Sequence, residues 1–192
     1  QSQAAARLLH DRARVVVLTT ATDPTLRRYD TVEGVGVSRI AVTQTGGWSV
    51  VRSTIDMLVE LGRLLPRVDL VHIQGFSSKN ILVSAMAKLY SRPLVLHLQT
   101  AKHDEPDAIK AQGRLAWWAF SSADAYLSVS PGLTERYLAA GLPPDRIREV
   151  PNGVDDARFA PASADERAAL RRRLDLPPDG PLILFVGVIS PD

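Results

Sequence analysis

The chain contains no cysteine among its 192 residues, so it has neither disulfide bridges nor thiolate metal sites. A chain without thiols fits a reducing compartment. Charge of one sign is also lacking, because 23 Lys and Arg oppose 21 Asp and Glu and leave a formal net charge of +2. So small a net charge gives no electrostatic footprint for nucleic acid. We therefore expect no nucleic-acid partner.

Long apolar runs are lacking as well. The longest, at residues 15–18 and 182–186, fall far below the roughly 20 residues that a membrane-spanning helix needs. The first residues lack both an initiating Met and the basic and apolar regions of a signal peptide. The sequence therefore predicts a soluble, cytoplasmic protein whose N-terminal end is truncated.

What is present is a regular alternation of short β-branched or aliphatic runs with longer amphipathic ones. This pattern predicts the α/β fold class, with a Rossmann-like parallel sheet covered by helices on both faces. The expected strands are 15–19, 70–74, 94–99, 125–129, 147–150 and 182–186, with an irregular strand or hairpin within 31–42. The expected helices are 1–10, 48–65, 79–90, 107–121, 131–140 and 165–174.

The helix expected at 131–140 has clear signals at both ends. Ser130 can cap its free amides, and Pro131 fits the first turn because that position needs no N–H donor. Gly141 can supply the left-handed residue that ends a helix.

Three segments follow from this pattern. Residues 1–150 form the Rossmann-like domain, and residues 151–161, with Asn152-Gly153 and a terminal proline, form a linker. Residues 162–192 contain one helix and one strand, too little for a domain. We therefore expect them to begin a second domain that is truncated.

Polar residues and glycines follow the strands of the predicted sheet. In open parallel α/β sheets, ligands bind outside the carboxyl ends of the strands, where loop amides and helix N-termini converge. The segments at these ends begin at Gln74-Gly75, Gln99-Thr100, Ser130 and Asn152-Gly153. The sequence therefore predicts a cleft at this edge.

Five ordered segments resemble the group-1, glycogen-synthase-like glycosyltransferases of the GT-B architecture. The segments are Asp69 to Gly75, Arg92 to Thr100, Ala123 to Ser130, Val150 to Phe159 (VPNGVDDARF) and Leu184 to Gly187. The fourth is the most specific, since it is close to the family's P-N-G-V-D hinge. The order and spacing of all five carry the resemblance, which is weak before residue 69.

This resemblance implies that the chain is most of the N-terminal, acceptor-side half of a GT-B enzyme. Residues 1–150 are then the acceptor domain without its first strand, 151–161 the interdomain hinge, and 162–192 the start of the donor-binding domain. The family transfers a sugar from a nucleotide sugar to a hydroxyl of a glycan, lipid or small molecule, usually with retention and without an essential metal. We therefore expect a nucleotide-sugar donor as substrate, no metal, no cofactor in this chain, and no activity of this fragment alone.

The resemblance also implies the site residues. The candidates for catalysis in the cleft are His97, Gln99 and Thr100, and the catalytic residues themselves are unassigned. The expected substrate-binding residues are Gln74, Gly75, Lys102, His103 and Ser130. Asn152 and Gly153 are the expected hinge, and Gly187 and Val188 the expected donor-phosphate loop.

Two positions depart from the family pattern. Gln99 stands where the family often has a histidine, and a glutamine orients hydroxyls but does not exchange a proton near neutral pH. Val188 stands where the family often has an arginine that neutralises the donor diphosphate.

Several alternatives stay open. His72 and His97 are also explained as hydrogen-bonded histidines at the edge of a core, and Lys102 to Glu105 as a solvated charge cluster. The helix at 107–121 carries basic and aromatic side chains, which suit weak peripheral association with the inner face of a membrane or simple packing on the sheet. A GT-B-shaped sugar-nucleotide epimerase and a non-catalytic Rossmann-like binding module are the competing functions.

Overall fold

The computed structural model describes residues 12–42, 47–98, 105–156 and 159–185. The chain divides into two compact units, Gln1–Pro151 and Asn152–Asp192. Each unit is described by itself.

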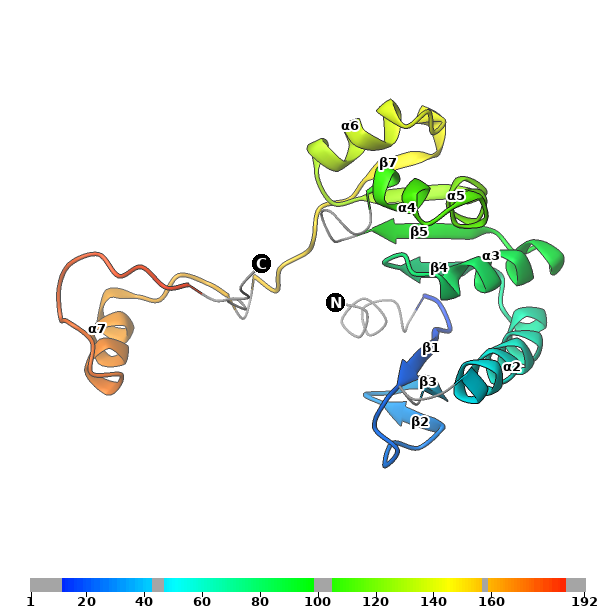
Figure 1. Ribbon diagram of the computed structural model, residues 1–192. Coiled ribbons are helices and arrows are strands. Elements are labelled where there is room, and N and C mark those ends of the chain that lie inside the picture. Colours follow the sequence, from blue (N-terminus) through cyan, green and yellow to red (C-terminus); the bar gives the residue numbers. More distant parts are fainter. Residues whose placement is uncertain (1–11, 43–46, 99–104, 157–158, 186–192) are drawn as a thin grey trace. The chain divides into compact units, whose positions relative to one another are not determined.

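Strands and helices alternate along the first unit (Figure 1). Its strands are β1 (Val16–Ala21), β2 (Tyr29–Val32), β3 (Val35–Ala41), β4 (Val71–Gln74), β5 (Leu94–Leu98), β6 (Ala125–Ser128) and β7 (Ile147–Glu149). Its α-helices are α2 (Gly47–Leu64), α3 (Lys79–Leu89), α4 (Pro106–Ala111), α5 (Arg114–Ser121) and α6 (Pro131–Ala139). Short 3-10 helices lie at Leu65–Arg67 and Pro144–Arg146.

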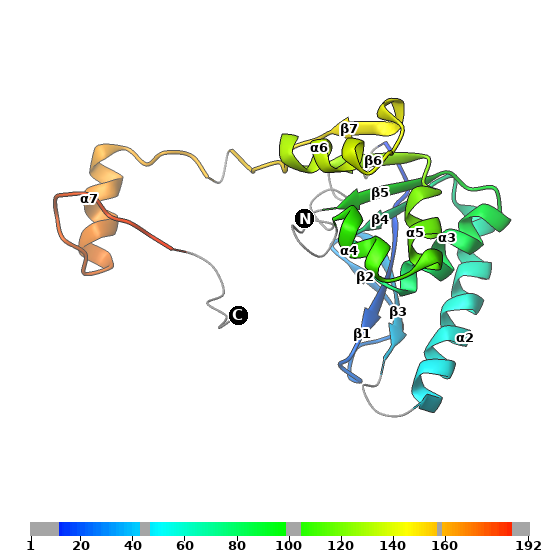
Figure 2. The ribbon, with the colours of Figure 1, turned by 45° about the horizontal axis from the view of Figure 1, so that its top comes forward.

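The strands form two sheets. One has the order β1-β3-β2, with β1 parallel and β2 antiparallel to β3. The other has the order β4-β5-β6-β7, in which every neighbouring pair is parallel (Figure 2). The α/β fold class with a parallel sheet, expected from the sequence, is confirmed.

The hairpin expected within 31–42 is the β2–β3 pair. Its two-residue turn consists of Glu33 and Gly34, which have φ angles of 51° and 85°. Positive φ at both central positions is the geometry that matches the twist of the flanking strands. Glycine adopts this conformation without strain, whereas Glu33 is an uncommon residue there.

The main core lies on one face of the four-stranded sheet. Leu94, Leu96 and Leu98 of β5 are completely buried there. Helices α3 to α6 all contribute residues to the same cluster. Phe120 of α5 lies at its centre, with ring contacts to Tyr126 and Tyr137 at centroid distances of 5.4 and 6.1 Å.

Helix α2 packs by a second cluster. Its residues Met57 and Leu61, with Leu65 just beyond the helix, contact Leu18 of β1 and Val71 of β4, among others. The helix therefore contacts strands of both sheets.

A buried carboxylate ties α2 to strand β2. Glu60 is 1% exposed and accepts hydrogen bonds from the hydroxyl of Tyr29, at 2.9 Å, and from the guanidinium of Arg63, at 2.7 Å. The Arg63 guanidinium also lies 4.5 Å from the centre of the Tyr29 ring. Burial acts to raise the pKa of Glu60, but these hydrogen bonds outweigh it and the pKa is lowered.

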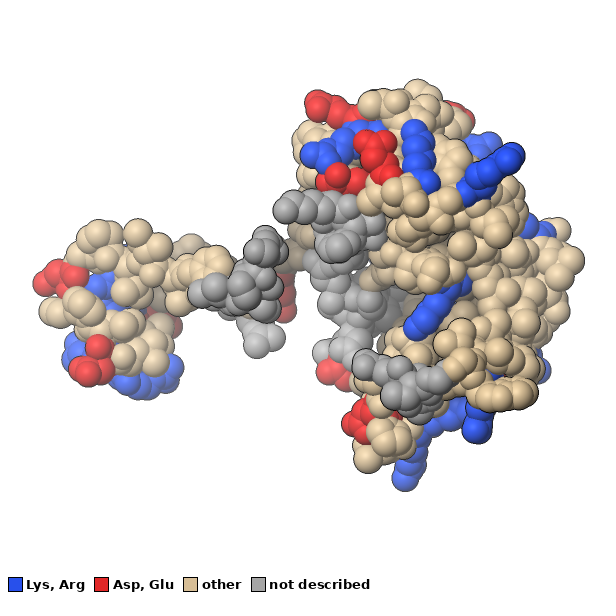
Figure 3. Space-filling view, in the orientation of Figure 1, with Lys and Arg blue, Asp and Glu red and all other residues tan. Residues whose placement is uncertain are grey.

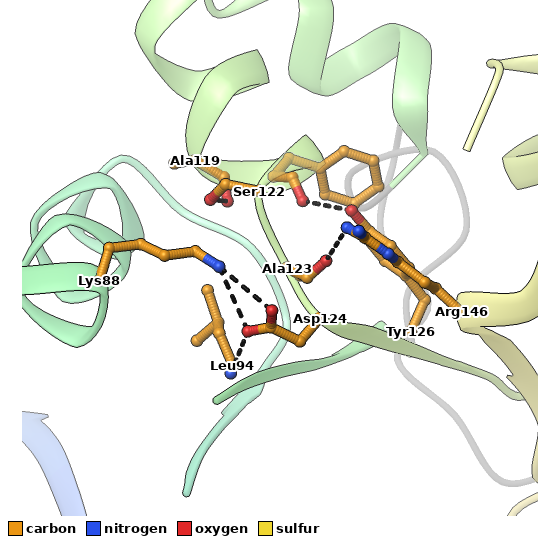
Figure 4. A network of polar contacts seen from close by, with 9 residues as sticks. Lys88, Leu94, Ala119, Ser122, Ala123, Asp124, Tyr126 and Arg146 are labelled. Atoms are coloured by element: carbon orange, nitrogen blue, oxygen red, sulfur yellow. Dashed lines mark hydrogen bonds and ion pairs between the residues drawn. The ribbon is translucent and has the colours of Figure 1, made fainter. Parts of the chain in front are cut away.

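A polar network holds the amino ends of β5 and β6 together (Figure 4). Asp124 accepts a hydrogen bond from the backbone N–H of Leu94 at 2.8 Å, and its own N–H donates to the Leu94 carbonyl at 2.8 Å. Lys88 of α3 donates to both carboxylate oxygens at 3.3 Å. Asp124, in the segment Ala123 to Ser130 that resembles the family, is therefore structural. It lies at the edge of the sheet opposite the strands' carboxyl ends.

Two expected elements are wrong in part. The helix expected at 107–121 is broken into α4 and α5, because Gly113 has a φ of 106°, which is incompatible with a continuous helix. The residues 182–185 of the last expected strand are exposed and form no strand, since no neighbouring strand in the described part of the chain pairs with them. The helix expected at 1–10 lies outside the described residues.

The second unit contains helix α7 (Ala164–Arg173). Its start is a capping box, in which Ser163 and Glu166 satisfy each other's backbone amides. Arg171 donates to the carbonyls of Pro177 and Gly180 and so holds the following segment against the helix. None of the residues of α7 is buried, so this helix contributes no core of its own.

The Asp124→Ala variant should lower the free energy of unfolding by about 1–3 kcal/mol, because it leaves the part-buried N–H of Leu94 without its acceptor. Its control is Lys88→Ala, which removes only the exposed ion pair and should cost less than about 1 kcal/mol. Urea denaturation of both variants gives the comparison. Equal losses would contradict the structural role assigned to the carboxylate.

The Glu60→Gln variant should lose about 2 kcal/mol of stability at pH 7, because hydrogen bonds to a charged group are replaced by neutral ones. Since the folded pKa is lowered, this stability is present above the ordinary pKa of about 4.3 and is lost as the pH falls towards the folded pKa. Unfolding curves of both proteins should therefore converge as the pH falls below the lowered pKa of folded Glu60. The control on the same helix is Asp56→Asn, whose 3.4 Å pair with Arg28 is exposed and should contribute less than about 1 kcal/mol.

Candidate functional site

The candidate site is the edge formed by the carboxyl ends of β4, β5 and β6. These strands are parallel neighbours, so the segments that follow them leave the sheet on the same side. In the register, Gln74 of β4 stands opposite His97 of β5, and Leu98 stands opposite Ser128 of β6. The predicted residues Gln74, Gly75, His97 and Ser130 therefore belong to one edge.

The turn after β4 is fixed by three hydrogen bonds. Gly75 has a φ of 72°, and its N–H donates to the His97 carbonyl at 2.9 Å. The amide of Asn80 donates to the Gly75 carbonyl at 2.9 Å, while Ser77 donates to the amide oxygen of Asn80 at 3.0 Å. The structure thus joins Gly75 and His97, which lie far apart in the sequence, and holds the loop in one conformation before any ligand binds.

Two histidines stack on the same face of the sheet. The rings of His72 and His97 lie 5.6 Å apart with an interplanar angle of 12°. Burial lowers the pKa of His97, and burial followed by the charge of His97 lowers the pKa of His72. Both rings are therefore neutral at pH 7, so each has one nitrogen that donates and one that accepts.

The Nε2 atom of His97 is buried and has no hydrogen-bond partner among the residues that the structure describes. A buried polar nitrogen without a partner is uncommon. The simple explanation of His97 as a hydrogen-bonded core histidine therefore does not account for this nitrogen.

The start of α6 forms the third part of the edge. Ser130 caps the helix, because its hydroxyl oxygen accepts from the N–H of Leu133 at 3.4 Å, and Pro131 follows in the first turn. Both features were expected from the sequence and are confirmed. The positive end of a helix dipole favours anionic groups, so this end of α6 suits a phosphate or carboxylate.

The loop after β5 lies outside the described residues, and with it Gln99, Thr100, Lys102 and His103. Its two ends are placed. Leu98 ends β5 in the centre of the sheet, and Glu105 forms an ion pair with Arg136 of α6. The described residues on either side of this segment therefore lie near the Gly75 turn and near α6, respectively.

The structure describes the expected hinge residues but not the expected donor-phosphate loop. The boundary between the two compact units falls between Pro151 and Asn152, directly before the expected hinge residues Asn152 and Gly153. Both residues are exposed and lie outside any helix or strand. Their role as a hinge stays a prediction, and Gly187 and Val188 lie outside the described residues.

Two contributors to this region, Asn80 and Arg136, were not predicted, and Glu105 was expected only as part of the charge cluster from Lys102 to Glu105. Asn80 follows Ser77 at the three-residue spacing of a local polar turn, so its role was detectable in principle. The pair between Glu105 and Arg136 joins two distant segments, and no local pattern announces it. In the described ranges, no cluster of three or more His, Cys, Asp or Glu side chains suits a metal ion.

The sequence model of the family described as "Glycosyl transferase 4-like domain" matches residues 2–153. This chain belongs to that family. The match covers the whole four-stranded sheet and the edge that carries the candidate site. It includes the first three of the five sequence segments and the start of the fourth, and agrees with the resemblance there.

Curated relatives of this glycosyl transferase 4-like chain are similar over short stretches. The D-inositol 3-phosphate glycosyltransferase of Acidothermus cellulolyticus is 53% identical over 51 residues, which are 27% of this chain and 11% of that protein. The protein of the same name from Salinispora tropica is 50% identical over 62 residues, 31% of this chain and 12% of that protein.

Solved structures of the same architecture include the Anabaena protein Alr3699/HepE in complex with UDP. The match has a TM-score of 0.53 with 14% identity, and it covers 85% of this chain and 50% of that chain. Its complex with UDP and glucose matches with a TM-score of 0.52 and 14% identity, over 83% of this chain and 50% of that one. At this identity the likeness shows the fold, and the chain spans about half the length of the Anabaena protein.

The Gly75→Ala variant should lower the free energy of unfolding by about 1–2 kcal/mol, because a Cβ is strained at positive φ. Gly132→Ala, at the start of α6, is the matched control: nothing lies within 4 Å of an added Cβ, and its φ is not positive. This control should leave stability unchanged or raise it by up to about 1 kcal/mol. A neutral Gly75→Ala variant in urea denaturation would refute the fixed turn.

Proposed function

We propose that the protein containing this chain is a glycosyltransferase that moves a sugar from a nucleotide-sugar donor to an acceptor hydroxyl. The family match over residues 2–153 carries the proposal. The names and ligands of the similar proteins support it, since the relatives are called glycosyltransferases and the Anabaena protein was crystallised with UDP. In this proposal the chain supplies the acceptor side, and transfer requires donor-binding residues outside it.

Each described part of the edge supports a role in this proposal. The Gly75 turn is proposed to bring fixed backbone groups to the acceptor, and the start of α6 a helix N-terminus. Holding the acceptor hydroxyl in one orientation contributes to catalysis by proximity. Gln74, Lys102, His103 and Ser130 are proposed to bind the acceptor or the donor in this way.

Catalysis is proposed to rest on positioning and electrostatics more than on a proton acceptor. His97 is neutral because burial lowers its pKa, so it is suited to accept or donate a hydrogen bond. Gln99 and Thr100 are proposed to orient the acceptor hydroxyl, which neither side chain deprotonates near pH 7. We propose retention at the anomeric carbon and closure about Asn152 and Gly153.

Compartment and partners complete the proposal. Cytoplasmic localisation is supported by the absence of cysteine, which fits a reducing compartment. In the described ranges, every helix is too short or too polar to cross a bilayer. The proposed partners are the nucleotide sugar and the acceptor. We also propose weak peripheral association with the inner face of the membrane.

The test uses the protein expressed from its complete reading frame. It is incubated with common nucleotide sugars, UDP-glucose first, and release of the nucleotide is followed with and without acceptors, beginning with D-inositol 3-phosphate because relatives carry that name. The expected result is release that depends on an acceptor. No release with any common donor, together with no donor binding in calorimetry, would refute the proposal, and an epimerised donor without transfer would favour an epimerase.

The Gln99→Ala variant should lower kcat/KM about tenfold, because one hydrogen bond to the acceptor, worth about 1.4 kcal/mol, is removed in the transition state. Gln112→Ala is the matched control, since Gln112 is an exposed glutamine at the end of α4. It should leave kcat/KM unchanged. Equal rates for both variants would remove Gln99 from the site.

A further inference from the structure

The two stacked histidines, His72 and His97, lie on the face of the sheet opposite the buried leucines of β5. In the register, His72 stands opposite Val95. Gln74 stands opposite His97, so the two histidine side chains are diagonal neighbours on one face. Their ring centroids lie 5.6 Å apart and their planes differ by 12°. This is the separation of stacked aromatic pairs, so the rings of β4 and β5 form one contact beside Gln74.

The stack restricts the ring of His97 where hydrogen bonds do not. The backbone of His97 is fixed, because β5 pairs on both sides and the His97 carbonyl accepts from the N–H of Gly75. Its ring is less restricted, since rotation about χ2 of histidine is broad. The Nε2 atom is buried and has no hydrogen-bond partner in the described part of the chain, so no bond at this nitrogen sets the rotation. The flat contact with the ring of His72 does.

The surroundings of the stack carry little charge. Beside the two rings, the same face of the sheet carries three uncharged residues: Gln74, Val95 and Leu127. The next side chain in this row, Arg148 of β7, donates to the carbonyls of Asp145 and Ile147. On the side of the molecule that Figure 3 shows, acidic and basic side chains gather over α6 and around the β2–β3 hairpin.

The two rings therefore influence each other's protonation. Burial lowers the pKa of both, and the charge of a protonated His97 lowers the pKa of His72 further. The pair accepts a second proton less readily than a first, and both rings are uncharged at pH 7. Two uncharged rings stack without repulsion, so the contact is maintained at this pH.

We propose that His72 is a positioning residue: its ring holds the imidazole of His97 in one orientation and so fixes where that imidazole hydrogen-bonds beside Gln74. The inference rests on the proposed function, in which His97 belongs to the cleft and accepts or donates a hydrogen bond. His72 acts through His97 and needs no contact with either substrate. A metal site fits the pair less well, because it needs further ligands, and in the described ranges no third His, Cys, Asp or Glu joins the two rings.

The stack is tested first without substrate, by NMR of the protein expressed from its complete reading frame with isotope-labelled histidine. We expect nuclear Overhauser contacts between the ring protons of His72 and His97. In His97→Gln the pKa of His72 should rise, because the charge of His97 no longer lowers it. No contact between the rings, or an unchanged pKa of His72, would overturn the inference.

Two matched variants then separate the flat ring from the space that it fills. His72→Phe keeps a ring that stacks on His97, whereas His72→Leu fills the position with a side chain that does not stack. His72→Leu should lower kcat about fivefold, because the hydrogen bond of a misoriented His97 is lost in part. His72→Phe should keep kcat within about twofold, because its ring still stacks. Transfer is measured first with UDP-glucose and D-inositol 3-phosphate, and the KM for the donor should be the same in both variants.

Urea denaturation of both variants separates positioning from stability. A loss of kcat in His72→Leu that His72→Phe restores, measured where both variants are fully folded, supports the inference. Equal kcat in both folded variants, with a difference in the urea midpoint alone, would assign His72 to stability and overturn it. An unchanged protein that transfers no sugar refutes the proposed function, and the ring contacts measured by NMR are then the result that upholds or overturns the role of His72.

Discussion

Strand β5 is the element on which the rest of the first unit depends. Its backbone pairs in parallel with β4 on one side and β6 on the other, and Leu94, Leu96 and Leu98 are completely buried beneath the helices. Burial of these leucines fixes the register, since a slip of one residue would bring Val95 and His97 into the core instead. The same register places His97 opposite Gln74, and the His97 carbonyl holds the N–H of Gly75.

The two edges of this sheet have separate tasks. At the amino edge, the Asp124 carboxylate accepts from the first N–H of β5 and from Lys88. This part of the segment Ala123 to Ser130, which resembles a family motif, therefore stabilises the fold. At the carboxyl edge, the Gly75 turn and the start of α6 present polar groups. A parallel sheet separates the stabilising contacts from the candidate site because all its strands end on one side.

The sequence was sufficient to predict elements with strong local signals. The strands of the four-stranded sheet and the boundaries of α6 follow from apolar runs and from Ser130 and Pro131. It was insufficient where the outcome depends on distant partners. The apolar periodicity predicted one helix at 107–121, but Gly113 divides it in two. Residues 182–185 form no strand despite their apolar run. The hydrogen bond that joins Gly75 to His97 depends on the register of two strands, which no local pattern gives.

The central claim is that ligands meet the carboxyl edge of this sheet and leave the amino edge untouched. Hydrogen exchange measured by mass spectrometry, on the protein from its complete reading frame with and without donor and acceptor, tests it most directly. The account predicts slower exchange at residues 74–80, 99–104 and 130–134, with no change at 91–94 and 122–124. Protection confined to the amino edge, or no protection at the carboxyl edge under saturating ligand, would contradict it.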